Sequence, residues 1–235
     1  METEDPLTEK PLTQDPFAGA AAGDVIGVNI QVPSTWYEFD VHPATVNRSI
    51  REAVAERVKQ RPELAEHQAE LVGTLKRAAR EARRGNVVYS GSMCEIVDGE
   101  PMVASVTVSV TTAVHETTGV TVPTGLDTLM GVLTPIAPGR RPTDPWRRVR
   151  VVALPEAGDA ARTEGIEDID IPDDNRSYRV VMMQTLVPFP GADPKVAVIS
   201  ASTPQLSLLQ PMLELFDLIT STFRFVYRAD LDTES

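Results

Sequence analysis

The stretch "NVVYSGSMCEIVDGEPMVASVTVSVTTA", residues 86–113, decides the fold class. Two arms rich in β-branched residues flank "DGEP", and this pattern predicts a β-hairpin with a tight turn. In the second arm, apolar residues alternate with hydroxyl-bearing ones. We expect one face to carry Met102, Ala104, Val106, Val108 and Val110, and the other to carry Ser105, Thr107, Ser109 and Thr111. Such alternation indicates an antiparallel sheet with one buried face and one polar or lightly covered face.

Further strands and helices flank this hairpin. Strands are expected at 25–33, 147–155, 178–190 and 195–203, with a closing strand of the same sheet at 223–228. Composition and apolar periodicity predict helices at 44–60, 63–84, 124–133 and 207–221. Short connections between consecutive strands favour an α+β fold, that is, a mostly antiparallel sheet with helices packed on it. We expect one α+β domain at 25–228, between a disordered acidic tail at 1–24 and an acidic C-terminal tail at 229–235.

The formal net charge of −12 is concentrated in residues 1–24, 156–176 and 228–235. We expect the acidic segment 156–176 to be a solvated, mobile loop. Its Asp168 and Asp170 lack the ligand spacing and central glycine of an EF-hand calcium loop. So acidic a chain disfavours nucleic acid as a partner.

Several features bear on location. The apolar runs are far shorter than the roughly 20 residues that cross a bilayer, so we expect no membrane association. The N-terminal residues carry acids and prolines instead of the basic start and apolar block of a secretory signal, which predicts a cytoplasmic location. The single cysteine, Cys94, excludes an intrachain disulfide and a cysteine-based zinc site, and we expect its thiol to be buried.

No residue pattern typical of catalysis is evident. The three histidines, His42, His67 and His115, share no local spacing, and no serine lies in a nucleophile elbow. The glycine-rich loops that bind dinucleotides or nucleoside triphosphates do not occur. We therefore expect no enzyme activity, no catalytic or metal-binding residues and no cofactor.

Two basic clusters remain. The cluster at the end of the second helix is a candidate partner-binding site and consists of Lys76, Arg77, Arg80, Arg83 and Arg84. The other cluster consists of Arg140, Arg141, Arg147, Arg148 and Arg150. Stabilisation by the helix dipole is a sufficient reason for the first cluster, and docking of another protein is the functional alternative.

The second half of the chain carries a recognisable series of structural residues. They are Leu154, Pro155, Gly158 and Arg162, then Pro188 and Pro190, then Ser202, Thr203 and Pro204, and finally Phe216, Asp217, Thr222, Phe223, Arg224 and Phe225. In this pattern, about residues 85 to 227 resemble the Mog1/PsbP-like fold group, particularly its uncharacterised actinobacterial-type members. The resemblance implies an α/β/α sandwich. It also implies a binding or assembly role, because members of the group share no catalytic constellation.

Three hypotheses about function follow. The first is a non-enzymatic cytoplasmic protein-binding or assembly factor that uses the polar sheet face or the basic helix end. The second is a small-ligand binder or enzyme with a pocket between helices and sheet, lined by Trp36, Tyr37 and Trp146. The third is a secretion-linked structural component. The expected partner is another protein, and the oligomeric state is left open.

Overall fold

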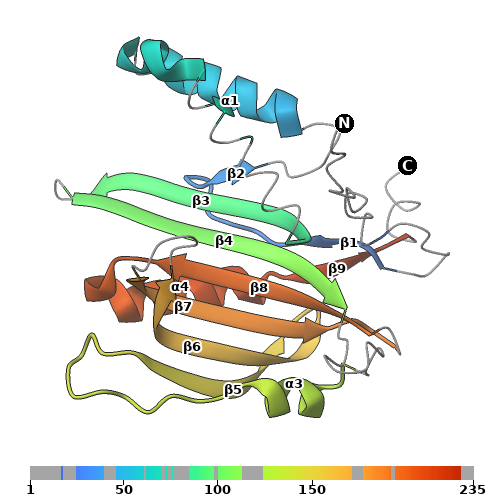
Figure 1. The fold of residues 1–235 in the computed structure, drawn as a ribbon. Coiled ribbons are helices and arrows are strands. Elements are labelled where there is room, and N and C mark those ends of the chain that lie inside the picture. The colour runs from blue at the N-terminus through green and yellow to red at the C-terminus, as the bar shows by residue number, and fades with distance from the viewer. Residues whose placement is uncertain are drawn as a thin grey trace, which may run out of the picture.

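The computed structural model describes residues 17, 25–39, 46–60, 62–69, 72–73, 76, 85–97, 100–112, 124–170, 177–191 and 194–228. Its main body is a seven-stranded antiparallel sheet in the order β2-β3-β4-β8-β7-β6-β5 (Figure 1). The strands are β2 (Tyr37–Phe39), β3 (Val87–Val97), β4 (Glu100–Thr112), β5 (Trp146–Leu154), β6 (Gly158–Asp170), β7 (Ser177–Pro188) and β8 (Lys195–Thr203). Helices pack on this sheet, which confirms the α+β class.

The β3–β4 hairpin lies where the sequence predicted it. In β4, Val106 and Val108 are completely buried. Ser105 and Thr107, on the opposite face of the strand, are half-buried. Strand β4 is paired on both sides, with β3 and β8, and because side chains alternate along a strand, its buried apolar residues face the core and its hydroxyl groups face away from it.

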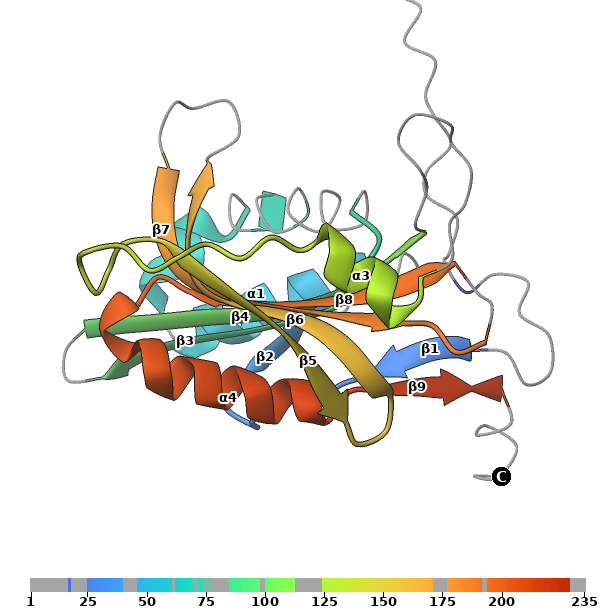
Figure 2. The same ribbon diagram turned by 90° about the horizontal axis from the view of Figure 1, so that it is seen from below.

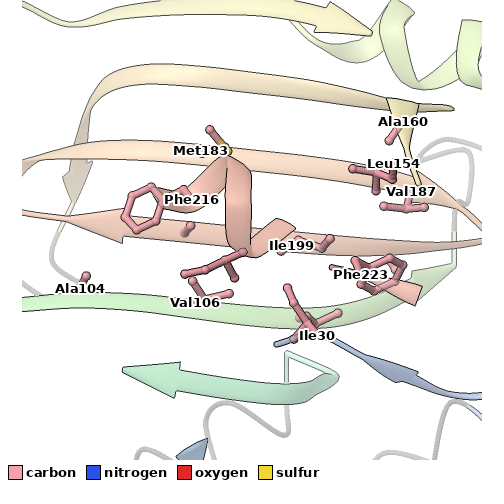
Figure 3. Packing of buried hydrophobic residues seen from close by; sticks show 14 of the residues in the cluster. Ile30, Ala104, Val106, Leu154, Ala160, Met183, Val187, Ile199, Phe216 and Phe223 are labelled. Atoms are coloured by element: carbon pink, nitrogen blue, oxygen red, sulfur yellow. The ribbon is translucent and has the colours of Figure 1, made fainter. Parts of the chain in front are cut away.

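The core lies between the apolar face of the sheet and α4 (Leu209–Ser221), which follows the short 3-10 helix η2 (Leu206–Leu208). This confirms the helix expected at 207–221. Phe216 has no exposed surface and belongs to the same buried cluster as Met183 of β7 and Ile199 of β8 (Figure 3). Burial of this apolar helix stripe is what fixes α4 on the sheet.

Helix α3 (Leu126–Val132) packs on the opposite face of the sheet from α4 (Figure 2). Its Leu129 is buried in a small cluster with Ala161 of β6 and Val196 of β8. The helix expected at 124–133 is therefore confirmed, and it covers one end of the face that carries the hydroxyl groups of β4.

Of the two helices expected before the hairpin, α1 (Val46–Gln60) confirms the first. The segment after it begins as a 3-10 helix, η1 (Pro62–His67), which starts at the proline that separates the two helices. Residues 68–69, 72–73 and 76 are helical, and the remaining positions up to 84 lie outside the described residues.

The closing strand exists, but the prediction that it belongs to the main sheet is wrong. Strand β9 (Arg224–Tyr227) pairs with β1 (Val25–Asn29) as a separate two-stranded sheet, which lies level with α4 in Figure 2. The ring centroid of Phe225 lies 5.2 Å from that of Phe223 and 4.9 Å from that of Phe189. These buried aromatic contacts hold β9 at the end of the core, on the helix side of the sheet.

The acidic segment 156–176 is not the solvated loop that its composition predicted. Most of it forms β6, in which Ala160, Ala161 and Ile166 are buried. The prediction failed because the central acids of this strand alternate with small and apolar residues and pair with arginines of the neighbouring strands. Residues 171–176 lie outside the described residues.

The expected tails, 1–24 and 229–235, lie almost entirely outside the described part of the chain. Phe17 is described, and its ring stacks on Phe189 with 6.4 Å between the centroids. An aromatic side chain from the first segment therefore contacts the same end of the core as β9.

Candidate functional site

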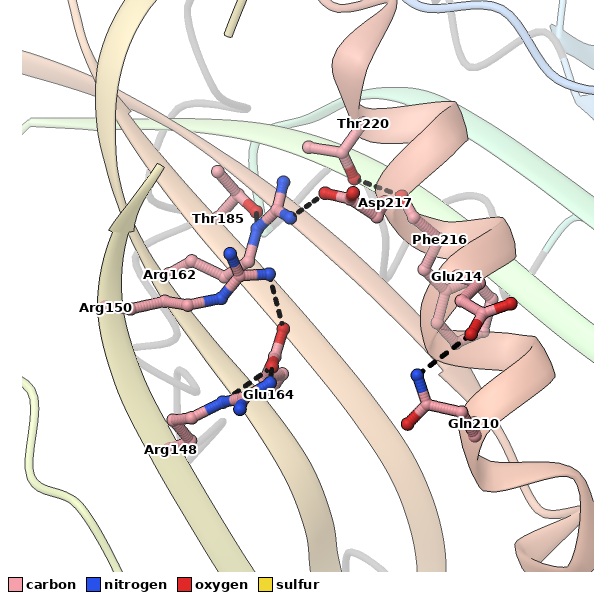
Figure 4. A network of polar contacts seen from close by, with 10 residues as sticks. All are labelled: Arg148, Arg150, Arg162, Glu164, Thr185, Gln210, Glu214, Phe216, Asp217 and Thr220. Atoms are coloured by element: carbon pink, nitrogen blue, oxygen red, sulfur yellow. Dashed lines mark hydrogen bonds and ion pairs between the residues drawn. The ribbon is translucent and has the colours of Figure 1, made fainter. Parts of the chain in front are cut away.

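Charged side chains of β5 and β6 form a network on the sheet face that α4 covers (Figure 4). The antiparallel register places Arg148 directly opposite Glu164, and Arg150 directly opposite Arg162. Arg148 Nε donates to Glu164 Oε1 over 2.8 Å, and Arg150 Nη2 donates to Glu164 Oε2 over 3.0 Å. Both oxygens of the Glu164 carboxylate therefore accept hydrogen bonds from β5.

Glu164 is the buried member of this group. Its side chain is 2% exposed, whereas those of Arg148 and Arg150 are 62% and 41% exposed. Burial alone would raise the pKa of the Glu164 carboxyl, but hydrogen bonds and positive charge from the two arginines hold that pKa below its ordinary value. Glu164 is thus ionised at neutral pH, and one positive charge of the two arginines is left over.

Arg162 links the sheet to α4. Its side chain has no exposed surface, its Nε donates to Thr185 Oγ1 of β7 over 2.9 Å, and its guanidinium is ion-paired with Asp217 of α4. Asp217 itself is 56% exposed. Two buried guanidinium nitrogens, Arg162 Nη2 and Arg150 Nε, have no hydrogen-bond partner within the described residues. The network therefore combines a structural ion pair beneath α4 with arginines that reach solvent at the sheet edge.

Two other acidic residues of β6, Glu167 and Asp168, are neutralised by arginines outside this network. Arg147 makes two hydrogen bonds to Glu167, of 2.8 and 2.6 Å, and these raise the pKa of the Arg147 guanidinium. Asp168 accepts two hydrogen bonds from Arg179, of 2.6 and 3.0 Å, which lower the pKa of its carboxyl. Asp168 is thus neutralised by an arginine of the neighbouring strand β7.

Strand β5 is one edge of the main sheet. The backbone N–H and C=O of Arg147 each form a 2.9 Å hydrogen bond with Ile136, on the side away from β6. Because backbone direction alternates along a strand, Val149, Val151 and Ala153 also turn their N–H and C=O groups away from β6. No hydrogen bond joins these outward groups to another described segment.

We call this feature the β5 edge: the outward backbone groups of Val149, Val151 and Ala153, with the side chains of Arg148 and Arg150. In the view of Figure 2, β5 is the strand nearest the viewer, with α3 on one side of the sheet and α4 on the other. The edge offers backbone donors and acceptors in a row, together with surplus positive charge. Such an arrangement can bind an extended chain.

Most of the predicted partner-binding cluster lies outside the described residues, so its grouping stays a prediction. Lys76 is half-buried in a helical segment, and the other four members, Arg77, Arg80, Arg83 and Arg84, lie outside the described residues. The second basic cluster is divided. Arg147, Arg148 and Arg150 are paired with glutamates of β6, whereas Arg140 and Arg141 are exposed before β5.

Sequence reasoning missed Arg162 and Glu164 as members of a site. Both lie in a segment that was assigned to a loop on the basis of its acidity. A signal was present, because the two-residue spacing of Arg162 and Glu164 matches that of Arg148 and Arg150 and would place all four on one face of a hairpin. The turn at Gly158, with φ of +82°, joins the two strands.

The three aromatic residues expected to line a pocket do not all lie side by side. Tyr37 lies on β2 and Trp146 on β5, which are opposite edges of the main sheet, and Trp36 is buried in the core. His42 and His115 lie outside the described residues, and His67 ends η1.

The expectation that Cys94 is buried is wrong, because its thiol is exposed. Met93 takes the inward-facing position of β3, so the next residue must face outward.

Comparison of the chain with protein-family models, curated proteins and solved structures finds no match. In the described ranges, no three His, Cys, Asp or Glu side chains are grouped so as to hold a metal ion. None of the helices in those ranges is both long enough and apolar enough to cross a membrane.

Proposed function

We propose that this protein is a non-enzymatic protein-binding or assembly factor, and that its partner adds an extended segment to the β5 edge. The observation that carries the proposal is the row of outward backbone groups at Val149, Val151 and Ala153. An unpaired strand edge is a template for another strand, and main-chain hydrogen bonds along such an edge supply affinity in many peptide-binding domains.

Features that block strand addition are few on this edge. β5 has nine residues and contains no proline. Among its outward backbone groups, those of Arg147 are already hydrogen-bonded to Ile136. Charged side chains such as Arg148 and Arg150 discourage indiscriminate pairing, so the edge favours a partner with complementary charge. The resemblance to the Mog1/PsbP-like fold group, with its binding and assembly factors, supports the same class of function.

Proline substitution tests the proposal. Val151→Pro removes one outward N–H but no hydrogen bond to β6, because proline is tolerated where the N–H of an edge strand faces solvent. Val151→Thr is the matched control, since it keeps the N–H and the β-branched shape. Tagged full-length chains are used for affinity purification at native abundance, and the proteins that co-purify are quantified.

We expect the wild type and Val151→Thr to recover the same partner and Val151→Pro to lose it. Circular dichroism spectra of the three chains establish that each is folded. Equal recovery of the partner by folded Val151→Pro would overturn the proposal that the β5 edge is the binding site.

A further inference from the structure

We infer that the β5 edge selects a segment in which acidic residues, two positions apart, alternate with apolar residues. This inference rests on the proposed function and specifies the chemistry of the partner. It follows from the different character of the two faces of β5, because a strand added to the edge places alternate side chains beside each face.

The face toward α4 is positive. Arg148 and Arg150 are two residues apart, so they project on the same face and reach solvent with 62% and 41% of their side chains. Glu164 neutralises one of these two charges, and both of its oxygens are already occupied. Side chains on directly opposed residues of paired strands have Cβ atoms about 4.5–5.5 Å apart, close enough for an ion pair. Because the free part of the edge begins at Val149, a carboxylate opposite Arg150 lies beside that arginine and diagonally within reach of Arg148, and a second carboxylate two positions further along reaches Arg150 diagonally.

The opposite face of β5 is apolar beyond Arg147, whose guanidinium is held by Glu167. Val151 is 47% exposed and Val149 is half-buried on this face. Ile136, opposite Arg147, continues the same row and is 42% exposed. Apolar side chains of the added strand would cover these groups, and Ile136 limits the strand to the part of the edge that begins at Val149.

A second copy of this chain is a poorer occupant. Antiparallel pairing of two β5 strands would gather four arginines and only two glutamates on one face, which repels the copies. A basic segment would be repelled for the same reason. An acidic segment instead neutralises the surplus positive charge of Arg148 and Arg150. Charge complementarity therefore favours an acidic segment as the strand that binds the β5 edge.

Two labelled synthetic peptides of identical composition test the inference by fluorescence anisotropy with the full-length chain. One has a core in which glutamate and valine alternate, and the other groups the glutamates and the valines in separate blocks. Only the alternating peptide can place all its carboxylates beside the arginines and all its valines beside Val149 and Val151. We expect it to bind about tenfold more tightly than the block isomer, and to weaken as salt is raised.

Variants separate charge selection from strand addition. Arg148→Gln should weaken binding of the alternating peptide about three- to fivefold, the usual effect of one partly exposed ion pair. Arg141→Gln, in the exposed bend before β5, is the matched control and should have no effect. Val151→Pro should abolish binding, and circular dichroism shows whether each variant is folded.

The outcomes distinguish the inference from the proposed function. If the isomers bind equally, or neither binds, or Arg148→Gln has no effect, the inferred partner chemistry is wrong. In those cases the loss or retention of the co-purifying partner in Val151→Pro still decides the proposed function.

If the alternating peptide binds folded Val151→Pro as tightly as the wild type, charge alone attracts it and strand addition is overturned. Sedimentation of the free chain as a dimer that Val151→Pro dissociates would assign the edge to a second copy instead.

Discussion

At the scale of single residues, the two members of the Arg162–Asp217 ion pair differ in burial. The guanidinium has no exposed surface, whereas the carboxylate is 56% exposed. Removal of one partner is costly when the charge left behind is buried, and much less costly when it can be hydrated. The loss of stability therefore depends on which of the two residues is replaced.

We expect Asp217→Ala to lower the free energy of unfolding by about 3 kcal/mol, because it leaves Arg162 charged and buried. Arg162→Met keeps the apolar stem and leaves only a hydrated Asp217, so its cost should stay below about 1.5 kcal/mol. Urea denaturation of both variants measures the difference. If Arg162→Met is the more destabilising of the two, the guanidinium is not desolvated as the structure shows.

Glu164 should make the free energy of unfolding depend on pH in the acidic range. The pKa of its carboxyl is lower in the folded protein than its ordinary value of 4.5. Its contribution to stability is therefore complete above that ordinary value and is lost as the pH falls through the lowered folded value. We expect the free energy of unfolding of the wild type to fall below about pH 4.5 more steeply than that of Glu164→Gln. Equal slopes for the two chains in urea denaturation from pH 6 to pH 3 would contradict the buried ion pair.

At the scale of elements, β6 shows where composition and pattern give opposite predictions. Its acidity predicted a loop, but its alternation of residues and its pairing with two arginine-bearing strands produce a central strand. Charge that is neutralised by a neighbouring strand cannot be recognised from the acids alone. The strand β9 illustrates a different difficulty, because its residues fit a strand equally well in either sheet and only the aromatic packing around Phe225 decides.

Helix α4 supplies a matched pair of substitutions. Phe216 has no exposed surface, and Leu218, two residues later, is 67% exposed. Phe216→Ala should lower the free energy of unfolding by about 3–5 kcal/mol, because it leaves a cavity between the helix and the sheet. Leu218→Ala should change it by less than about 0.5 kcal/mol. Similar values for the two variants in thermal or urea denaturation would show that α4 does not cover the core in this orientation.

The β5–β6 pair depends on a close backbone approach at Gly165. A Cβ at this position would collide with the backbone carbonyl of Trp146. We expect Gly165→Ala to destabilise the protein by about 1–3 kcal/mol, since the strands must separate. Gly131→Ala in α3 is the control: no atom lies within 4 Å of its added Cβ, so it should be neutral or stabilising by up to about 1 kcal/mol. Equal effects of the two substitutions on the melting temperature would contradict the strand pairing.

At the scale of the whole molecule, the sequence predicted much of the fold and little of the site. The hairpin at β3–β4, the strands β5, β7 and β8, and the helices α1, α3 and α4 could be predicted because each has a regular apolar period. The site could not, because it combines the backbone of an edge strand with side chains of three further elements. Neither the position of β5 at the edge nor the alignment of Arg148 with Glu164 is encoded by any single segment.

The most direct test of the account is amide hydrogen exchange at β5, measured residue by residue by NMR. In the free protein, the outward amides of Val149, Val151 and Ala153 should exchange rapidly, and the amides of Arg150 and Val152, which face β6, slowly. At saturation with the alternating acidic peptide, the three outward amides should become protected. Outward amides that remain fast while the peptide is bound, or that are already protected in the free protein, would contradict strand addition at the β5 edge.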